Sequence, residues 1–232
     1  SKTQSIDLIA DAATATVSNV VASKSQALAN GADTVTWTAT VKDANQNPVN
    51  NMAVNWSSDN ASLKLSGSSS QTNSGGVATI TATSVKTADA IMTAALTTPA
   101  GSASASKVSY IADASTTQLS AVTADKTQAL ANGTDLITLS TKVTDAQGNI
   151  LANTDVNWST NPATGTLSGS STKTNEQGIA TVTLSSTNVS DYVVTASTNG
   201  VSAKSSSLVF AADAATAKIS TLTADKTTGV VA

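Results

Sequence analysis

Cysteine, histidine and arginine are absent from the 232 residues of this chain, and Glu176 is its only glutamate. Without thiol and imidazole groups, the chain cannot form a cysteine nucleophile, a Ser-His-Asp triad or the usual zinc sites. The formal net charge is −3, and the lysines form no cluster that would bind a phosphate backbone. We therefore expect no cofactor and no nucleic-acid partner, and most classes of enzyme are excluded.

Aromatic residues make up only 3% of the chain, and no hydrophobic run is long enough to cross a bilayer. The N-terminal residues do not combine positive charge with an apolar stretch, as a signal peptide does. We expect any export signal or membrane anchor to lie outside this stretch of sequence, so that membrane contact is made only there. The hydrophobic cores must be packed mainly from valine, isoleucine, leucine and alanine.

Much of the sequence occurs twice. The run Lys24-Ser-Gln-Ala-Leu-Ala-Asn-Gly31 returns as Lys126-Thr-Gln-Ala-Leu-Ala-Asn-Gly133, at an offset of 102 residues. The same offset relates Val54-Asn-Trp-Ser57 to Val156-Asn-Trp-Ser159. Self-similarity at a fixed period indicates an array of like modules, and a period of about 100 residues is typical of one independent domain.

The edges of the repeats predict the domain boundaries. One junction motif occurs three times, around Asp11, Asp113 and Asp213. It contains no glycine, no proline and no long polar spacer, so we expect a short link that restrains bending between modules. The predicted parts are the last strand of a preceding module (1–11), two complete modules (12–113 and 114–213) and the first strand of a truncated module (214–232). In the two partial modules, four apolar residues would then lack a complete core: Ile6, Leu8, Ile219 and Leu222.

Within a module the hydrophobic period is two. Residues 34–42 alternate between apolar side chains and threonine or lysine, as expected for a half-buried strand whose successive side chains face opposite sides. Residues 137–143 keep the same phase. Further strands are predicted around the tryptophans and after glycine-rich turns, with a last hairpin closing at 99–101 and again at 199–200. The predicted inward residues are Val35, Trp37, Ala39, Val41, Ile137, Leu139, Thr141, Val143, Val54, Trp56, Val156 and Trp158.

About seven short strands, with turn signals every 8 to 12 residues and a tryptophan on the third strand, are typical of an immunoglobulin-like sandwich. The predicted fold class is all-β: tandem immunoglobulin-like β-sandwiches joined end to end. A disordered Ser/Thr-rich stalk is the compositional alternative. Such a chain would not keep strand alternation and turns in register between the copies.

Several segments resemble a known family. They are 24–31, 41–44, 47–49, 54–56 and 72–79, with their equivalents in the second copy. They are similar to the bacterial Ig-like (Big_1-type) repeats of the intimin and invasin adhesins, the inverse autotransporters. The resemblance implies a stalk on the bacterial cell surface, anchored in the outer membrane. It also implies neighbouring Ig-like modules as partners and a host-cell receptor bound by a distal tip. Tips of this family usually contain a disulfide, so the absence of cysteine places this chain in the shaft.

Three kinds of site can be weighed from the residues. Asp43–Asn47 spaces oxygen ligands as a calcium loop does, but Pro48 replaces the required glycine and Val54 replaces the twelfth-position glutamate, which favours a plain turn. Asp11, Asp113 and Asp213 could share a cation or could cap backbone N–H groups, and the sequence leaves this open. The tryptophans could stack on sugars, although their inward phase favours burial. We therefore assign no catalytic, cofactor-binding or metal-binding residue.

Three functions remain as alternatives. The first is a structural spacer that projects an adhesive tip. The second is a module that itself binds a host receptor or glycan, which requires an exposed aromatic or apolar loop patch. The third is an aspartate-based glycosidase, which requires two carboxyl groups about 5 to 10 Å apart in a cleft. The repeats and the short junction favour the spacer.

Overall fold

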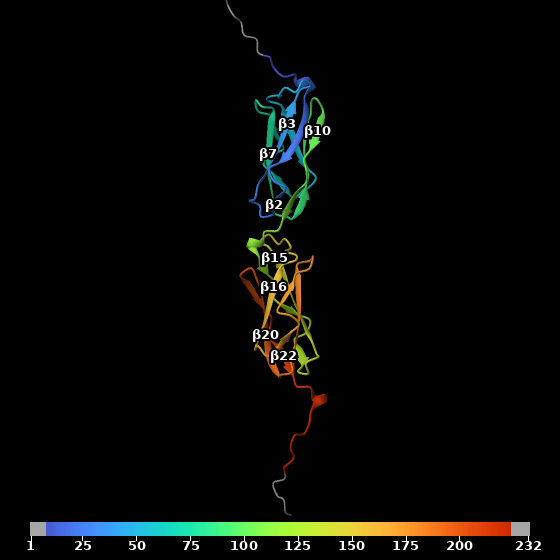
Figure 1. The fold of residues 1–232 in the computed structure, drawn as a ribbon, viewed down its shortest axis with the longest axis vertical. Coiled ribbons are helices and arrows are strands. Elements are labelled where there is room, and N and C mark those ends of the chain that lie inside the picture. Colours follow the sequence, from blue (N-terminus) through green and yellow to red (C-terminus); the bar gives the residue numbers. More distant parts are fainter. Residues whose placement is uncertain (1–7, 224–232) are drawn as a thin grey trace, which may run out of the picture. The chain divides into compact units, whose positions relative to one another are not determined.

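The computed structural model describes residues 8–223, which form strands, loops and three single-turn 3-10 helices. None of the helices in this described part is long and apolar enough to span a membrane. The chain divides into two compact units, residues 1–118 with 144–151, and residues 119–143 with 152–232 (Figure 1). Each unit is an all-β immunoglobulin-like sandwich, so the predicted fold class is confirmed.

The first unit has two four-stranded sheets. Their strand orders are β1-β3-β7-β5 and β10-β9-β4-β6, and a small third sheet has the order β2-β11-β8. Residues from both four-stranded sheets meet in one core, with Trp37 and Ile80 on one side and Trp56 and Ala94 on the other. The elements are η1 Ala12–Thr14, β1 Thr16–Ala22, β2 Gln26–Leu28, β3 Val35–Lys42, β4 Ala53–Ser58, β5 Leu63–Leu65, β6 Ser69–Gln71, β7 Val77–Ser84, β8 Ala88–Ala90, β9 Met92–Leu96, β10 Gly101–Ser104 and β11 Val108–Ile111.

The first stretch of the sandwich changes sheets. β1 pairs antiparallel with β3, and its register shifts at a bulge where Asn19 has φ 52°. After Ser23 the chain crosses to the other side, and β2 pairs in parallel with the last strand, β11. One N-terminal segment thus covers β3 at an edge of the first sheet and β11 in the small third sheet, which reduces the number of unpaired strand edges.

The second unit repeats this plan. The sheet orders are β12-β15-β19-β17, with β13 also pairing β15, and β14-β22-β20-β16-β18, with β21 pairing β20. One long strand, β20, does what β8 and β9 do separately in the first unit. The elements are η2 Ala114–Thr116, β12 Gln118–Leu119, β13 Thr123–Ala124, β14 Gln128–Leu130, β15 Ile137–Thr144, β16 Asp155–Asn161, β17 Thr166–Leu167, β18 Ser171–Lys173, β19 Ile179–Ser185, β20 Ser190–Thr198, β21 Val201–Lys204, β22 Leu208–Ala211 and η3 Ala214–Thr216.

The predicted alternation matches the observed burial. Along β3 every second residue is fully buried, and β15 shows the same phase, with Thr141 buried among apolar neighbours. The Thr141 hydroxyl donates to the carbonyl oxygen of Ser120 at 2.8 Å, which satisfies its polar group. The hairpins predicted at 99–101 and 199–200 join β9 to β10 and β20 to β21.

The segments beside the two sandwiches differ from the strands. Residues 8–11 and 217–223 lie outside any strand, and the side chains of Leu8, Ile9, Ile219 and Leu222 are at least 90% exposed. These exposed side chains agree with the expectation that they lack a complete core. Ile6 lies outside the described residues, and the assignment of both segments to neighbouring modules stays a prediction.

Candidate functional site

The repeated run that begins at Lys24 builds a loop held by its own polar side chains. The Lys24 ammonium group pairs with the Asp33 carboxylate, whose Oδ2 also accepts a hydrogen bond from the backbone N–H of Leu28 at 2.8 Å. Asn30 Oδ1 accepts from the N–H groups of Ala32 and Asp33 at 3.0 and 2.9 Å. The carboxylate and the ammonium group therefore bind each other, and the carboxylate and the amide oxygen bind the loop backbone, which fixes the loop between β2 and β3.

The second copy forms the same loop. Lys126 pairs with Asp135, and Asp135 Oδ2 accepts from Leu130 N–H at 2.8 Å. The hydrogen bond from the lysine, followed by that from the backbone N–H, holds the pKa of Asp33 and of Asp135 below the ordinary value. Lys24 and Asp33 recur as Lys126 and Asp135 at the common offset of 102 residues. This recurrence could have predicted the two ion pairs, which sequence reasoning missed.

These lowered pKa values predict acid sensitivity. An aspartate whose folded pKa lies below its unfolded value of about 3.9 contributes stability above that value and loses it as the pH falls through the folded pKa. We expect the melting temperature to fall as the pH drops below about 4. Asp33→Asn combined with Asp135→Asn should flatten this part of the profile, measured by calorimetry between pH 7 and pH 2. Glu176→Gln, on an exposed turn, is the control and should leave the profile unchanged.

The loop considered for calcium is a turn closed by its own carboxylate. Asp43 Oδ1 accepts from the N–H groups of Asn45 and Asn47 at 2.9 and 2.8 Å. Asp43 Oδ2 accepts from the Asn47 side-chain amide at 3.0 Å and from Asp11 N–H at 3.1 Å. The Asn47 side chain, with these backbone N–H groups, lowers the pKa of Asp43 despite its burial. With four donors on its two oxygens, the carboxylate serves the turn.

The junction aspartates all cap a 3-10 turn. Oδ1 of Asp11, Asp113 and Asp213 accepts from the backbone N–H two residues ahead, at 2.9 to 3.1 Å. Asp113 also accepts from the Ser115 hydroxyl and, through Oδ2, from the Asn30 amide at 3.0 Å, and these bonds lower its pKa. Within residues 8–223 no group of three or more carboxylates is placed to hold a metal ion.

The Asn149 side chain links the Asp145 loop to the backbone of earlier residues of the first unit. It is only 5% exposed, and its amide nitrogen donates to Asp145 Oδ2 at 2.9 Å and to the carbonyl oxygens of Val85 and Ala29 at 3.1 and 3.3 Å. Its carbonyl oxygen accepts from Thr87 N–H at 3.1 Å. Burial alone would raise the pKa of Asp145, but bonds from the Asn149 amide and three backbone N–H groups outweigh it and lower the pKa.

The three tryptophans are buried, as their phase predicted. Trp56 and Trp158 are each 5% exposed, and their indole N–H groups donate to Ser70 and Thr172 hydroxyls at 2.8 Å. Trp37 is fully buried, and its Nε1 has no hydrogen-bond partner in the described part of the chain. Leu139 is fully buried at the equivalent position of the second unit. The rings therefore form cores, and none is presented for stacking on a sugar.

The unpaired indole N–H predicts an asymmetry between two substitutions. A buried donor without a partner costs about 1–3 kcal/mol, so Trp37→Phe removes an unfavourable group while losing some packing. We expect its free energy of unfolding to change by less than about 1 kcal/mol. Trp56→Phe loses packing and a satisfied hydrogen bond, and should cost about 1–2 kcal/mol more than Trp37→Phe in urea unfolding. Equal losses would contradict this explanation.

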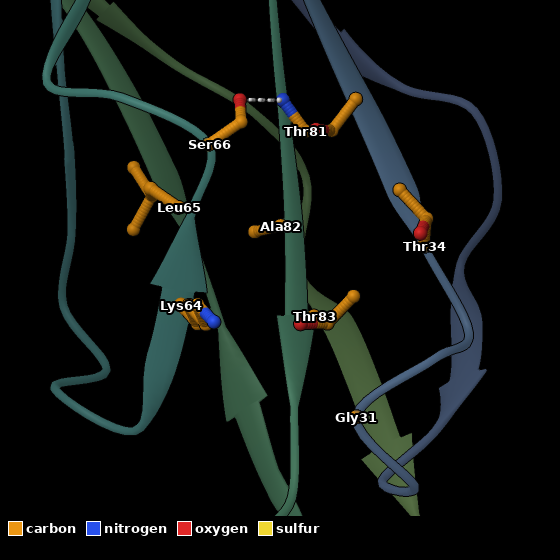
Figure 2. Close-up of a pocket in the computed structure, with 8 residues that line it drawn as sticks. All are labelled: Gly31, Thr34, Lys64, Leu65, Ser66, Thr81, Ala82 and Thr83. Carbon is orange, nitrogen blue, oxygen red and sulfur yellow. Dashed lines mark hydrogen bonds between the residues drawn. The ribbon is translucent and has the colours of Figure 1, made fainter.

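One hollow on the surface of the first unit is lined by small, mostly uncharged residues, with Lys64 as the only charged residue of its lining. It has a volume of about 220 Å³ and lies over β5 and β7 beside the loop that contains Gly31 (Figure 2). Figure 2 shows the Ser66 hydroxyl accepting from Thr81 N–H, at 3.2 Å, across the gap between the two segments. Its lining residues are Gly31, Thr34, Lys64, Leu65, Ser66, Thr81, Ala82 and Thr83. Without a carboxylate in this lining, the hollow offers neither acid nor base for glycoside hydrolysis.

Comparisons with known proteins identify the domains. The model of the bacterial Ig-like domain (group 1) family matches residues 17–111 and 119–211. The inverse autotransporter adhesin YeeJ of Escherichia coli K12 is 34% identical over 97% of this chain and 10% of YeeJ. Intimin of E. coli O127:H6 is 34% identical over 80% of this chain and 19% of intimin. Among solved structures, the E. coli adhesin FdeC has a TM-score of 0.64 at 23% identity, over 89% of this chain and 66% of that one.

The chain spans between a tenth and a fifth of the length of these two curated relatives. One matched range falls in each repeat, so both modules are of this domain type, and the resemblance to intimin-like adhesins is confirmed. Domains of this family are not enzymes, and neither is this chain. The chain belongs to the bacterial Ig-like domain (group 1) family, as two consecutive Ig-like domains of the kind found in cell-surface adhesins.

Proposed function

We propose that this chain is a segment of an adhesin's shaft that holds an adhesive tip away from the bacterial surface. The proposed modules are residues 12–113 and 114–213, with no catalytic, metal or cofactor site in either. The proposal rests on the observation that the repeated polar residues form hydrogen bonds and ion pairs inside the protein. Lys24, Asp33, Asn30 and Asp43 bind the loops of their own module, and their equivalents in the second copy do the same.

The described surface supports this role over ligand binding. On the sandwiches themselves, large exposed apolar residues are scattered over separate elements, such as Val21 on β1, Ile179 on β19 and Val189 before β20. Singly exposed apolar residues are normal on protein surfaces, whereas a binding site gathers them into a patch. The buried tryptophans leave no aromatic platform, so the alternative of a module that binds a host receptor or glycan has less support.

The proposed partners follow from the family. Neighbouring Ig-like modules would contact this chain directly, and a host-cell receptor would be bound by a tip elsewhere in the parent protein. The proposed location is the bacterial surface, outside the outer membrane, with membrane contact made only by an anchor in another part of the parent. The match to YeeJ covers only 10% of that adhesin, which supports the assignment of these modules to one part of a much longer protein.

The test separates spacing from binding. In the parent adhesin, residues 12–213 are replaced by two unrelated Ig-like domains of equal length, and attachment to host cells is counted. A shaft segment makes no contact with the host, so its exact sequence should not matter for attachment. The number of attached cells should stay within about twofold of the original, because no binding energy is lost. The purified 232-residue chain should not compete with attachment. Loss of attachment after the exchange, together with competition by the free chain, would instead show that these modules bind the host.

A further inference from the structure

Two equivalent loops of this chain have the same internal hydrogen bonds. We call residues 43–47 the Asp43 loop and residues 145–149 the Asp145 loop. In each loop the aspartate accepts from two backbone N–H groups and from the asparagine amide, at 2.8 to 3.0 Å. In each case it also accepts, at 3.1 Å, from the N–H of the junction aspartate that precedes the module. A threonine hydroxyl of the 3-10 turn closes both networks at 3.2 Å.

The two loops differ at their third and fourth residues, and they differ in what lies against them. In the first unit the Asp145 loop is covered, because Asn149 bonds to the backbone of Ala29, Val85 and Thr87. Beside it, Asn30 donates to Asp113, which is 6% exposed. The Asp43 loop has no such cover within residues 8–223. Asn47 is exposed, its amide bonds only to Asp43 among the described residues, and Asp11 is exposed as well.

An apolar hollow adjoins the exposed loop. It has a volume of about 420 Å³ and lies between residues 8–12 and residues 48–50, with Leu8, Ile9 and Pro48 in its lining. A second hollow of about 340 Å³ overlaps it and includes Asn47 itself. Leu8 and Ile9 are 95% and 90% exposed, whereas Tyr110, at the position equivalent to Leu8, is buried. Exposed polar groups and exposed apolar groups thus lie next to each other.

We propose that the Asp43 loop, with Asp11 and the adjoining hollow, is a docking surface for the end of another Ig-like module of this same type, joined to it through residue 11. Asn47 would take the place of Asn149, bonding two backbone carbonyls and one backbone N–H of that module. Asp11 would accept from its loop asparagine, as Asp113 accepts from Asn30. The inference rests on the proposed function, because a preceding module is present only if this chain is part of a shaft.

The residues that cover the Asp145 loop indicate what kind of module would cover the Asp43 loop. Only Asn30 contributes a side chain to the contacts around the Asp145 loop, and it recurs as Asn132 in the second copy, where it donates to Asp213 at 3.4 Å. Val85 and Thr87 contribute only backbone atoms, and their equivalents are Thr187 and Val189. Asn30, which uses its side chain, is thus repeated, whereas Val85 and Thr87 are replaced and the backbone acceptor Ala29 is retained as Ala131. Any module that keeps the asparagine and these loops would therefore fit.

The experiment compares Asn47 in two chains. One is the 232-residue chain, and the other is an extended chain in which residues 12–113 occur twice in succession ahead of residue 114. Asn47→Asp keeps the size of the side chain and removes its donors. In the extended chain, Asn47→Asp in the second copy should lower the melting temperature as much as Asn149→Asp does in the 232-residue chain. In the 232-residue chain, Asn47→Asp should have a clearly smaller effect. Asn45→Asp, a neighbouring exposed residue, is the matched control and should change neither.

A second readout requires no substitution. NMR can follow the solvent exchange of the Asn47 side-chain amide protons. In the second copy of the extended chain this exchange should be at least about tenfold slower than in the 232-residue chain, because the amide is then covered by the preceding module. Equal effects of Asn47→Asp in both chains, or unchanged exchange, would overturn the docking surface. Either result would leave the shaft proposal standing, since that is tested by attachment to cells. Competition by the free chain would defeat the shaft proposal without altering the amide exchange.

Discussion

Gly76→Ala is expected to reduce the free energy of unfolding of the first unit by at least about 3 kcal/mol, combining a disfavoured backbone conformation with a steric clash. Gly76 has φ +70°, a region where alanine is penalised. A Cβ atom there would lie 2.5 Å from the carbonyl oxygen of Val41 and 3.1 Å from Pro48 Cα. The Val41 carbonyl oxygen is held in place because it accepts from the N–H of Val49, the residue after Pro48, at 3.1 Å, and Val41 N–H donates to the carbonyl oxygen of Gly76 at 2.8 Å.

A control separates the two causes. Gly148 has φ +78°, but a Cβ atom added there would have no neighbouring atom within 4 Å, so Gly148→Ala should show only the backbone cost of about 1–2 kcal/mol. Urea unfolding followed by tryptophan fluorescence, with hydrogen exchange to report each unit separately, measures both variants. Similar losses for the two variants would mean that the approach to Val41 is looser than the structure indicates.

Trp158→Ala is expected to reduce the free energy of unfolding of the second unit by about 3–5 kcal/mol, the usual cost of emptying a large aromatic site in a core. Trp158 lies on β16, where it is paired with Ala196 of β20, and its indole N–H donates to Thr172. Alanine would leave both a cavity and an unpaired hydroxyl. Since this is a large part of the stability of a small domain, the second unit should melt well below the first in calorimetry.

The milder Trp158→Phe tests which loss dominates. Phenylalanine keeps most of the ring but not the hydrogen bond, so it should cost about 1–2 kcal/mol. If Trp158→Ala cost no more than Trp158→Phe, the ring would not be packed as a core residue. Neither variant should alter the hydrogen exchange of the first unit beyond the residues 144–151 that belong to it.

The sandwich core was predictable because the period of two is a local property. Whether Val35, Trp37 and Val41 face inward depends only on their spacing along one strand, and all three are fully buried. Because the sequence repeats, burial of Ile137 and Leu139 follows from the same spacing in the second copy. The break between β8 and β9 was not predictable, because β20 runs unbroken through equivalent residues whose pattern is the same.

The loop contacts could not be predicted in the same way. Asn149 bonds to Val85, 64 residues away, through a carbonyl oxygen that every residue possesses. Sequence shows that Asn47 and Asn149 recur, but backbone acceptors leave no signature, so their partners appear only once the chain is folded. For the junction aspartates the sequence narrowed the alternatives to a cap or a cation, and the structure shows the N–H groups that they cap.

The parallel pairing of β2 with β11 determines how a module resists a pulling force. The two strands run in the same direction, β2 in the N-terminal part of the module and β11 as its last strand, so opposite pulls that reach them from the two ends of the module slide them along each other. Hydrogen bonds such as Ala29 N–H to the Ile111 carbonyl, at 2.7 Å, and Ser109 N–H to the Ser25 carbonyl, at 2.9 Å, are then loaded together in shear, without being peeled open one at a time. β14 and β22 repeat this arrangement. In each module the hydrogen bonds between these two strands would therefore have to break together before the strands separate under a pull along the chain.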